Sequence, residues 1–233
     1  MKFKQRPYII INNKRSDLIE GLLITKSPTI SKPPKRVNIE EVDGKDGYFI
    51  NELGFSGYDK EIGIGLYGNY NIDNVIGYLS QNGTIVFSNE PDKVYTFNQT
   101  EQIDFERLVR YKTATVKYRV QPFKHKINEQ IRTDTGLLTV YNEGNVNSKP
   151  ILTINGNGNF TILLNNKEAV KLVNVDGNIT LNVEDLNAYN NGNLYNRHVQ
   201  GNLEDLTLPM GKSEINILGS LNSATIEKIS RWI

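Results

Sequence analysis

The chain has 233 residues, and its 27 lysines and arginines nearly balance 26 aspartates and glutamates, which gives a formal net charge of +1. Such a chain has no long-range field that would concentrate polyanions or hold it on an anionic membrane, so neither specific nucleic-acid recognition nor membrane binding is expected. It has no cysteine and only two histidines, which excludes disulfides, a thiol nucleophile and zinc–thiolate or histidine-rich metal sites. We therefore expect no enzyme activity and no metal or cofactor, and the length favours two domains of about 100–150 residues.

The first half of the chain has the period-two alternation of β-branched and aromatic residues that is typical of strands. Turn-forming Asp-Gly and Asn-Gly pairs at 43–44, 46–47 and 82–83 separate several of these stretches. The predicted strands are residues 8–11, 22–27, 36–41, 62–66, 84–87, 94–97, 103–109 and 113–121.

One helix is predicted in this half, from Ile72 to about Ser80. Asp73 lies in its first turn, and Val75, Ile76 and Leu79 have helical spacing. A single helix among strands indicates a β-barrel-like sheet with one short covering helix, because a doubly wound fold needs several helical crossovers. We assign residues 1–126 to this N-terminal domain.

The composition changes after Lys126, since residues 127–233 contain twenty asparagines and residues 1–126 only ten. Short, evenly spaced strands with Gly/Asn turns are typical of a β-sandwich, and we assign residues 127–233 to it. The polar stretch 124–135 is predicted to be a linker. The predicted strands are residues 136–141, 150–155, 159–165, 167–174, 177–183, 203–208, 212–218 and 225–232.

Residues 63–68 match the G-x-G-x-x-G pattern of dinucleotide-binding loops. Ile62, Ile64 and Leu66 alternate with the glycines as one buried strand face would, and no parallel strand is predicted at the required distance. We interpret the glycines as structural.

Acidic residues gather in three places. Glu40, Glu41, Asp43 and Asp46 could ligate calcium, but their spacing lacks the alternation of a calcium loop and favours a solvated hairpin loop. The pairs at 184–185 and 204–205 could be imagined as glycosidase carboxylates, yet nothing places them around one cleft. We interpret both pairs as loop caps.

A run of cations interleaved with aromatic residues extends from Arg107 to Lys126, as a nucleic-acid-binding surface would require. Alternation argues against that interpretation, because Val116, Tyr118 and Val120 read as the buried face of a strand and leave Lys117 and Arg119 on the exposed face. Two interpretations stay open: a subunit interface or an ordinary solvated face. The candidate interface residues are Arg107, Arg110, Lys117 and Arg119.

Several segments carry a family resemblance. Residues 73–95 combine a helix, a turn, an apolar strand, Pro91-Asp92 and Tyr95, and the pattern continues through residues 105–111 and a strand that ends in Pro122-Phe123. Residues 145–156 and 208–217 match further along, although Met210 separates Pro209 from Gly211 and Ser213 stands where asparagine is usual. These segments resemble the distal tail proteins of long-tailed, siphovirus-type bacteriophages of Gram-positive bacteria.

The resemblance implies a structural hub at the tail tip or baseplate. It implies an N-terminal ring-forming domain that assembles into a homo-hexamer, and a C-terminal galectin-like β-sandwich. The implied partners are the major tail tube protein, the tail-associated fibre or lysin protein and, in some members, receptor-binding proteins, with DNA passing unrecognised through the lumen. The implied location is the virion tail tip, with the host cytoplasm during assembly.

Two other functions are compatible with the residues. The sandwich could be a lectin-like carbohydrate-binding module for host cell-wall adhesion, although Phe160, Tyr189, Tyr195 and Trp232 form no obvious stacking platform in the sequence. A glycosidase would need a carboxylate pair that the sequence does not reveal, and it ranks last.

Overall fold

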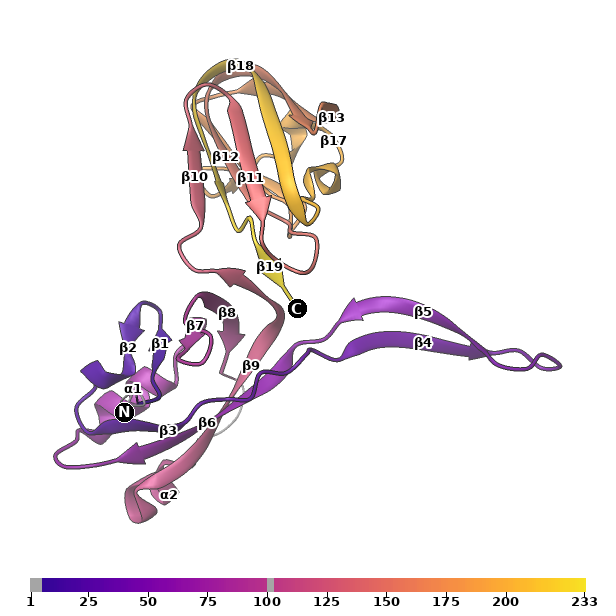
Figure 1. Cartoon of the computed structure of the whole chain (residues 1–233). Helices are drawn as coiled ribbons and strands as arrows, with labels where there is room; N and C mark the ends of the chain where they lie inside the picture. The colour runs from indigo at the N-terminus through magenta and orange to yellow at the C-terminus, as the bar shows by residue number, and fades with distance from the viewer. Residues whose placement is uncertain (1–5, 100–102) are drawn as a thin grey trace, which may run out of the picture. The chain divides into compact units, whose positions relative to one another are not determined.

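A computed structural model describes residues 6–99 and 103–233. It is mainly β, as predicted, and it divides into two compact units, one ending at Lys124 and the other spanning His125–Trp232 (Figure 1). Each unit has its own cluster of buried apolar side chains.

The N-terminal unit is built on a curled antiparallel sheet with the strand order β2-β1-β7-β8-β9-β6-β3. A separate two-stranded sheet, β4-β5, belongs to the same unit. The strands are β1 (Ile9–Ile11), β2 (Lys14–Arg15), β3 (Leu22–Lys26), β4 (Lys35–Glu41), β5 (Tyr48–Phe55), β6 (Tyr58–Leu66), β7 (Gly83–Phe87), β8 (Lys93–Asn98) and β9 (Thr113–Lys126).

Strands β6 and β9 form the centre of this sheet. Ile62 lies opposite Val116 and both are buried, as their alternation predicts. Gly63 lies within β6, where a Cβ atom would come within 2.6 Å of Thr25 Oγ1. The G-x-G-x-x-G stretch is therefore a strand packed against β3, which confirms that its glycines are structural.

Two helices occur in this unit, where the sequence analysis predicts one. Helix α1 (Ile72–Leu79) is confirmed, and the Asn71 side chain caps it by accepting from the Asp73 and Asn74 amides. Helix α2 (Phe105–Tyr111) replaces the strand predicted over residues 103–109.

The strand prediction failed at α2 because a seven-residue amphipathic stretch fits either period. The Asp104 carboxylate accepts from the Arg107 amide at 2.8 Å and caps the helix start, and Lys112 ends the helix at φ 59°. Leu108 is the one buried residue of α2, so the sequence lacks the repeated apolar positions from which a helix is predicted.

The C-terminal unit is an antiparallel β-sandwich in which β18 pairs with β10, β11 and β12. Short 3₁₀ helices connect some elements of both units: η1 (Ser16–Leu18), η2 (Asn196–His198) and η3 (Leu203–Leu206). The strands are β10 (Gln130–Thr133), β11 (Leu137–Asn142), β12 (Ile151–Leu164), β13 (Lys167–Val175), β14 (Asn178–Asn182), β15 (Asn187–Asn190), β16 (Asn193–Leu194), β17 (Val199–Gly201), β18 (Gly211–Glu227) and β19 (Arg231–Trp232).

Several sequence predictions in this unit are wrong. The strands predicted at 150–155 and 159–165 are one strand, β12. Strand β18 contains the strand predicted at 212–218 and the start of the one predicted at 225–232, whose end is β19. Both long strands pass through an irregularity in their pairing, where Gly219 has φ 145° and a Cβ atom would lie 2.5 Å from the Asn159 carbonyl oxygen. The glycines that signal turns in the sequence therefore mark bends within continuous strands.

Two further segments differ from prediction. Residues 203–208 contain η3 instead of a strand, because the Asn202 side chain accepts from the Glu204 amide and starts a helical turn. The segment predicted as a linker contains β10, which pairs with the end of β18 from Gln130 opposite Glu227 to Thr133 opposite Ala224.

A buried ionic network holds the segment that precedes β4. Lys124 Nζ lies 2.6 Å from Glu90 Oε1, the Tyr95 hydroxyl donates to Glu90 Oε2 at 2.5 Å, and Lys60 Nζ donates to the Thr29 carbonyl at 2.8 Å. Asn89 also donates to the Pro28 carbonyl at 2.8 Å. These contacts fix residues 28–29 on the sheet and so fix where the following hairpin leaves it.

The network makes stability depend on pH in a defined direction. Burial alone raises the pKa of Glu90, but hydrogen bonds from Lys124 and Tyr95 and the charges of Lys124 and Lys60 outweigh it, so the pKa of Glu90 lies below its ordinary value. The stabilising contribution is therefore complete above the unfolded pKa of about 4.3 and is lost as the pH falls through the lower folded value.

We predict that Glu90→Gln lowers the free energy of unfolding by about 3 kcal/mol at pH 7, because it leaves the buried Lys124 ammonium without its carboxylate. Glu204→Gln is the matched control: Glu204 is mostly exposed and 4.0 Å from Lys149, so its loss should cost less than about 1 kcal/mol. Urea denaturation of both variants measures the difference. Equal costs would show that the buried network does not stabilise the fold.

Candidate assembly interface

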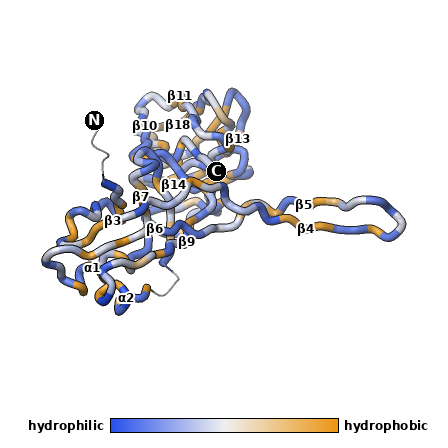
Figure 2. Tube along the Cα trace, turned by 60° about the horizontal axis from the view of Figure 1, so that its bottom comes forward, coloured by the Kyte–Doolittle hydropathy of each residue, from blue (hydrophilic) through white to orange (hydrophobic). Residues whose placement is uncertain are grey.

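The β4-β5 hairpin, called the arm below (residues 35–55), extends away from the sheet of its unit (Figure 1). Its strands pair only with each other among the described residues. The sequence analysis predicts β4 and misses β5, although residues 48–53 carry apolar side chains near a turn and a partner strand. Figure 2 shows hydrophobic stretches along both strands of the arm.

The register gives the arm two unlike faces. Residues directly opposite each other in an antiparallel pair point to the same side, and Val37 opposes Glu52, Ile39 opposes Ile50, and Glu41 opposes Tyr48. One face therefore carries Val37, Ile39, Ile50 and Tyr48, with Glu52 and Glu41 at its two ends. The other carries Asn38 opposite Asn51 and Glu40 opposite Phe49.

The apolar face of the arm is uncovered in the single chain. Ile39 is 54% exposed, Ile50 50% and Tyr48 60%, whereas Ile62 in the sheet is fully buried. An isolated two-stranded hairpin is marginally stable in water, and contiguous exposed apolar side chains mark an interaction site or an aggregation liability. The arm thus has the properties of a segment that packs against another molecule.

The far end of the arm is acidic. Glu41, Asp43 and Asp46 are exposed, and none of them forms an ion pair within the described residues. Lys45 lies over the Phe49 ring, at 4.1 Å from its centroid. The acidic cluster lies at a hairpin turn, which confirms the hairpin-loop interpretation. No group of three acidic or histidine side chains among residues 6–99 and 103–233 is arranged to hold a metal ion.

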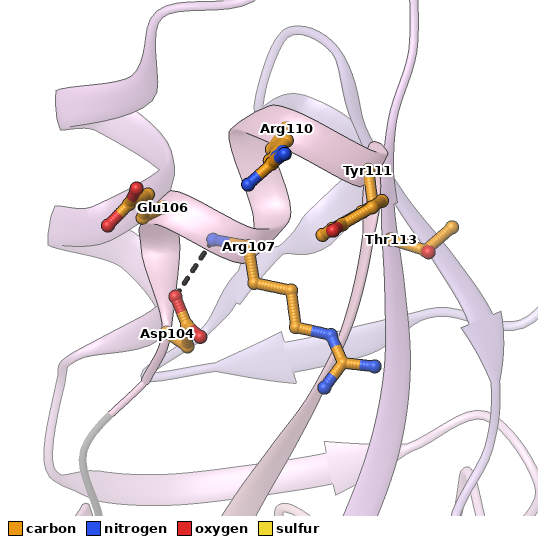
Figure 3. A pocket seen from close by; sticks show the side chains of 6 residues that line it. All are labelled: Asp104, Glu106, Arg107, Arg110, Tyr111 and Thr113. Atoms are coloured by element: carbon orange, nitrogen blue, oxygen red, sulfur yellow. Dashed lines mark hydrogen bonds between the residues drawn. The ribbon is translucent and has the colours of Figure 1, made fainter.

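A hollow lies beside helix α2 in the same unit. It consists of two adjoining pockets of about 540 and 520 Å³ that share Asp104, Arg107 and Thr113. We call it the α2 groove. Figure 3 shows the Arg107 side chain extending from the helix into this space, with Arg110 and Tyr111 on the following turn. The remaining lining residues come from β3, β6 and β9 and include Lys26, Gly63, Thr115 and Lys117.

The structure brings three of the four candidate interface residues to this groove. Arg107, Arg110 and Lys117 line it, and Lys117 Nζ also lies 3.4 Å from Glu61. Arg119 is paired with Asp59 at 3.1 Å and is not among the groove residues. Their role in an interface stays a prediction.

The other cations of the predicted run lie elsewhere. Lys124 is buried against Glu90, and Lys126 pairs with Glu143 at 2.6 Å. The run therefore does not form a single basic surface. Sequence spacing could not show this, because β9 turns successive side chains to opposite faces and Lys124 near its far end is buried.

The acidic pairs of the C-terminal unit are engaged separately. Glu184 lies 2.9 Å from the buried Arg231 guanidinium, and Asp185 accepts from Asn182 at 2.5 Å. Glu204 lies at the start of η3. The side chains that cap these turns are Asn182 and Asn202, which accept from the Glu184 and Glu204 amides, so the carboxylates lie in capped turns and do not cap them.

Two aromatic side chains of the sandwich, Phe160 and Tyr195, are also engaged within the unit. Phe160 is in the core, and the Tyr195 ring stacks on His198 with 3.6 Å between centroids while it packs against the core cluster. Neither ring presents the open face that sugar stacking requires. No helix in the described parts of the chain is long and apolar enough to cross a membrane.

The fold of the chain, a curled sheet with a projecting arm and a β-sandwich, matches that of a solved phage protein. The chain is similar to the crystal structure of SPP1 Dit, described as a paradigm of the hub adsorption apparatus in phages that infect Gram-positive bacteria. The TM-score is 0.62 at 14% identity, over 94% of this chain and 97% of that one. The fold resemblance expected from the sequence is confirmed.

Two further similarities are weaker. A chain of the phage p2 baseplate structure in its activated conformation with strontium has a TM-score of 0.47 at 10% identity, over 96% of this chain and 98% of that one. A chain of the corresponding structure with calcium has a TM-score of 0.49 at 11% identity, over 95% of this chain and 96% of that one. No family model matches the sequence. No curated protein matches it either.

We predict that Ile39→Ser with Ile50→Ser changes the free energy of unfolding of the dilute protomer by less than about 1 kcal/mol, because both side chains are already half exposed. Ile62→Ala, which empties a fully buried site, should cost about 2–5 kcal/mol. Chemical denaturation at concentrations where the protein is monomeric measures both. A large cost for the arm variant would mean that the arm packs on its own chain.

Proposed function

We propose that the protein is a non-catalytic structural hub of a bacteriophage tail, and that six copies assemble into a ring at the distal end of the tail tube. The observation that carries this proposal is the arm, whose apolar face no described residue of the same chain covers. The shared fold with SPP1 Dit supports it, since that protein is described as a hub of an adsorption apparatus.

Ring formation would bury the apolar face of the arm without any other protein. A face that protrudes from one copy and packs on a different face of the next copy is a heterologous contact, and such contacts close into a ring when the rotation between neighbours allows it. One arm per subunit then gives one such contact per interface, and every subunit both offers an arm and receives one.

The ring would join two parts of the tail. On one side it would bind the major tail tube protein, and on the other the tail-associated fibre or lysin protein. The C-terminal units would project outward, where receptor-binding proteins could dock. DNA would pass through the lumen without specific recognition, in keeping with a net charge of +1. The place of action would be the virion tail tip, after assembly in the host cytoplasm.

We predict that the purified chain forms rings of six copies at micromolar concentration. Native mass spectrometry should give six protomer masses, and negative-stain images should show six-fold views. A protein that stays monomeric at all concentrations, both alone and mixed with tail tube protein, would contradict the proposal.

The arm variant Ile39→Ser with Ile50→Ser should weaken ring formation, because it removes buried apolar area from every interface. We expect its apparent dissociation constant for assembly to be at least about tenfold higher. A matched variant on the exposed surface of the sandwich, Leu194→Ser, removes an apolar side chain that is 67% exposed and should assemble like the unchanged protein. Equal loss in both would show that the effect is not specific to the arm.

A separate binding experiment addresses the lectin-like alternative. Purified host cell-wall polysaccharide is titrated onto the assembled protein and followed by calorimetry. Saturable binding by a protein that never forms rings would favour the carbohydrate-binding function over the hub.

A further inference from the structure

We infer that the α2 groove receives the acidic end of the arm of a neighbouring copy. The inference rests on the proposed ring, and it names the surface on each side of the subunit contact. The occupant is residues 40–47 of a second copy of this chain.

The charges of the two surfaces are complementary. The arm end has four carboxylates and one ammonium between positions 40 and 47, and all of these residues are exposed. The α2 groove is lined by Lys26, Arg107, Arg110 and Lys117, against the two carboxylates of Asp104 and Glu106. Opposite excess charges on two faces of one chain steer copies together and fix their register.

The groove cations are placed to accept carboxylates. Neither Lys26 nor Arg107 forms an ion pair with any described residue, and Asp104 already accepts from the Arg107 amide as the helix cap. Figure 3 shows the Arg107 side chain reaching into the hollow, where its planar fork can bind a carboxylate through two hydrogen bonds. These cations line the two adjoining pockets of about 540 and 520 Å³.

Apolar surface accompanies the charges on both sides. The arm brings Ile39, Ile50 and Tyr48 next to its acidic end. On the receiving side, helix α2 exposes Tyr111 at 61% and Val109 at 40% beside its cations. Exposed apolar side chains flanked by charges on both partners are the composition of a protein–protein interface, with an apolar core and a polar rim.

The arm does not reach the α2 groove of its own copy. It extends away from the sheet, and α2 lies at another part of the unit in both views (Figures 1 and 2). At about 3.3 Å per residue, strand β4 alone spans roughly 23 Å, so the arm carries its charged end well beyond its own sheet. A second copy is therefore the partner that the charges and the reach both fit.

Charge reversal tests the pairing. The groove variant is Lys26→Glu with Arg107→Glu, and the arm variant is Asp43→Lys with Asp46→Lys. All four positions are exposed, so both variants should fold, which circular dichroism and thermal denaturation check. Each variant alone should lose ring formation, with an apparent dissociation constant at least about tenfold higher, because like charges then face each other.

The decisive sample is the equimolar mixture of the two variants. In an alternating ring with an even number of subunits, each unchanged acidic arm meets an unchanged basic groove, and each reversed arm meets a reversed groove. Rings should therefore return in the mixture and contain three copies of each variant by native mass spectrometry. Surface reversals elsewhere, Lys167→Glu with Lys171→Glu and Asp134→Lys with Asp205→Lys, should assemble like the unchanged protein.

The absence of cysteine from the chain allows a second measurement. In Asp46→Cys with Thr115→Cys, a short bis-maleimide reagent should link neighbouring copies into covalent multimers up to the full ring. Either single-cysteine variant should give no species beyond a dimer.

The outcomes separate the two proposals. If the unchanged protein forms no ring, the proposed function fails. If it forms rings and both reversed variants also form rings, the proposed function stands and the groove assignment is overturned. If the groove variant forms rings but binds duplex DNA less well than the unchanged protein, the groove assignment is also overturned. The groove cations would then face the DNA that passes through the lumen.

Discussion

Burial of the apolar face of the arm is the constraint on which the rest of this protein's organisation depends. Two paired strands can satisfy their backbone hydrogen bonds with each other, but they have no second layer on which to bury Ile39, Ile50 and Tyr48. The sheets of both units solve the same problem internally, by packing their apolar faces around two core clusters. Among the described residues no second layer covers the arm, and in the proposed ring a neighbouring copy would supply it.

In the proposed ring, the remainder of the N-terminal unit would both present that arm and receive one. The Glu90–Lys124–Tyr95 network is buried at a cost in desolvation, and together with Lys60 it fixes the chain on the sheet just before the arm begins. On another part of the unit, the short helix α2 and strands β3, β6 and β9 bring together the groove cations. A rigid origin for the arm matters because a small angular error at its base becomes a large displacement at its end.

The C-terminal unit has a different character. Its asparagines cap turns and connect neighbouring loops, as in the hydrogen bonds from Asn178 to Asn191 and from Asn196 to Asn187. Tyr195 stacks on His198 and Glu184 pairs with Arg231 within the unit. These contacts hold the loops of the sandwich together.

The sequence by itself determined the mainly β class, the buried face of β9, the structural role of the β6 glycines and the position of helix α1, because each depends on periodicity over a few residues. Tertiary structure decided the rest. Packing of Leu108 and capping by Asp104 made α2 a helix, and pairing across the sandwich joined the predicted strand pairs into β12 and β18. The α2 groove draws residues from positions 25 to 117, and whether the arm's apolar face is covered depends on the whole fold, so neither follows from local pattern.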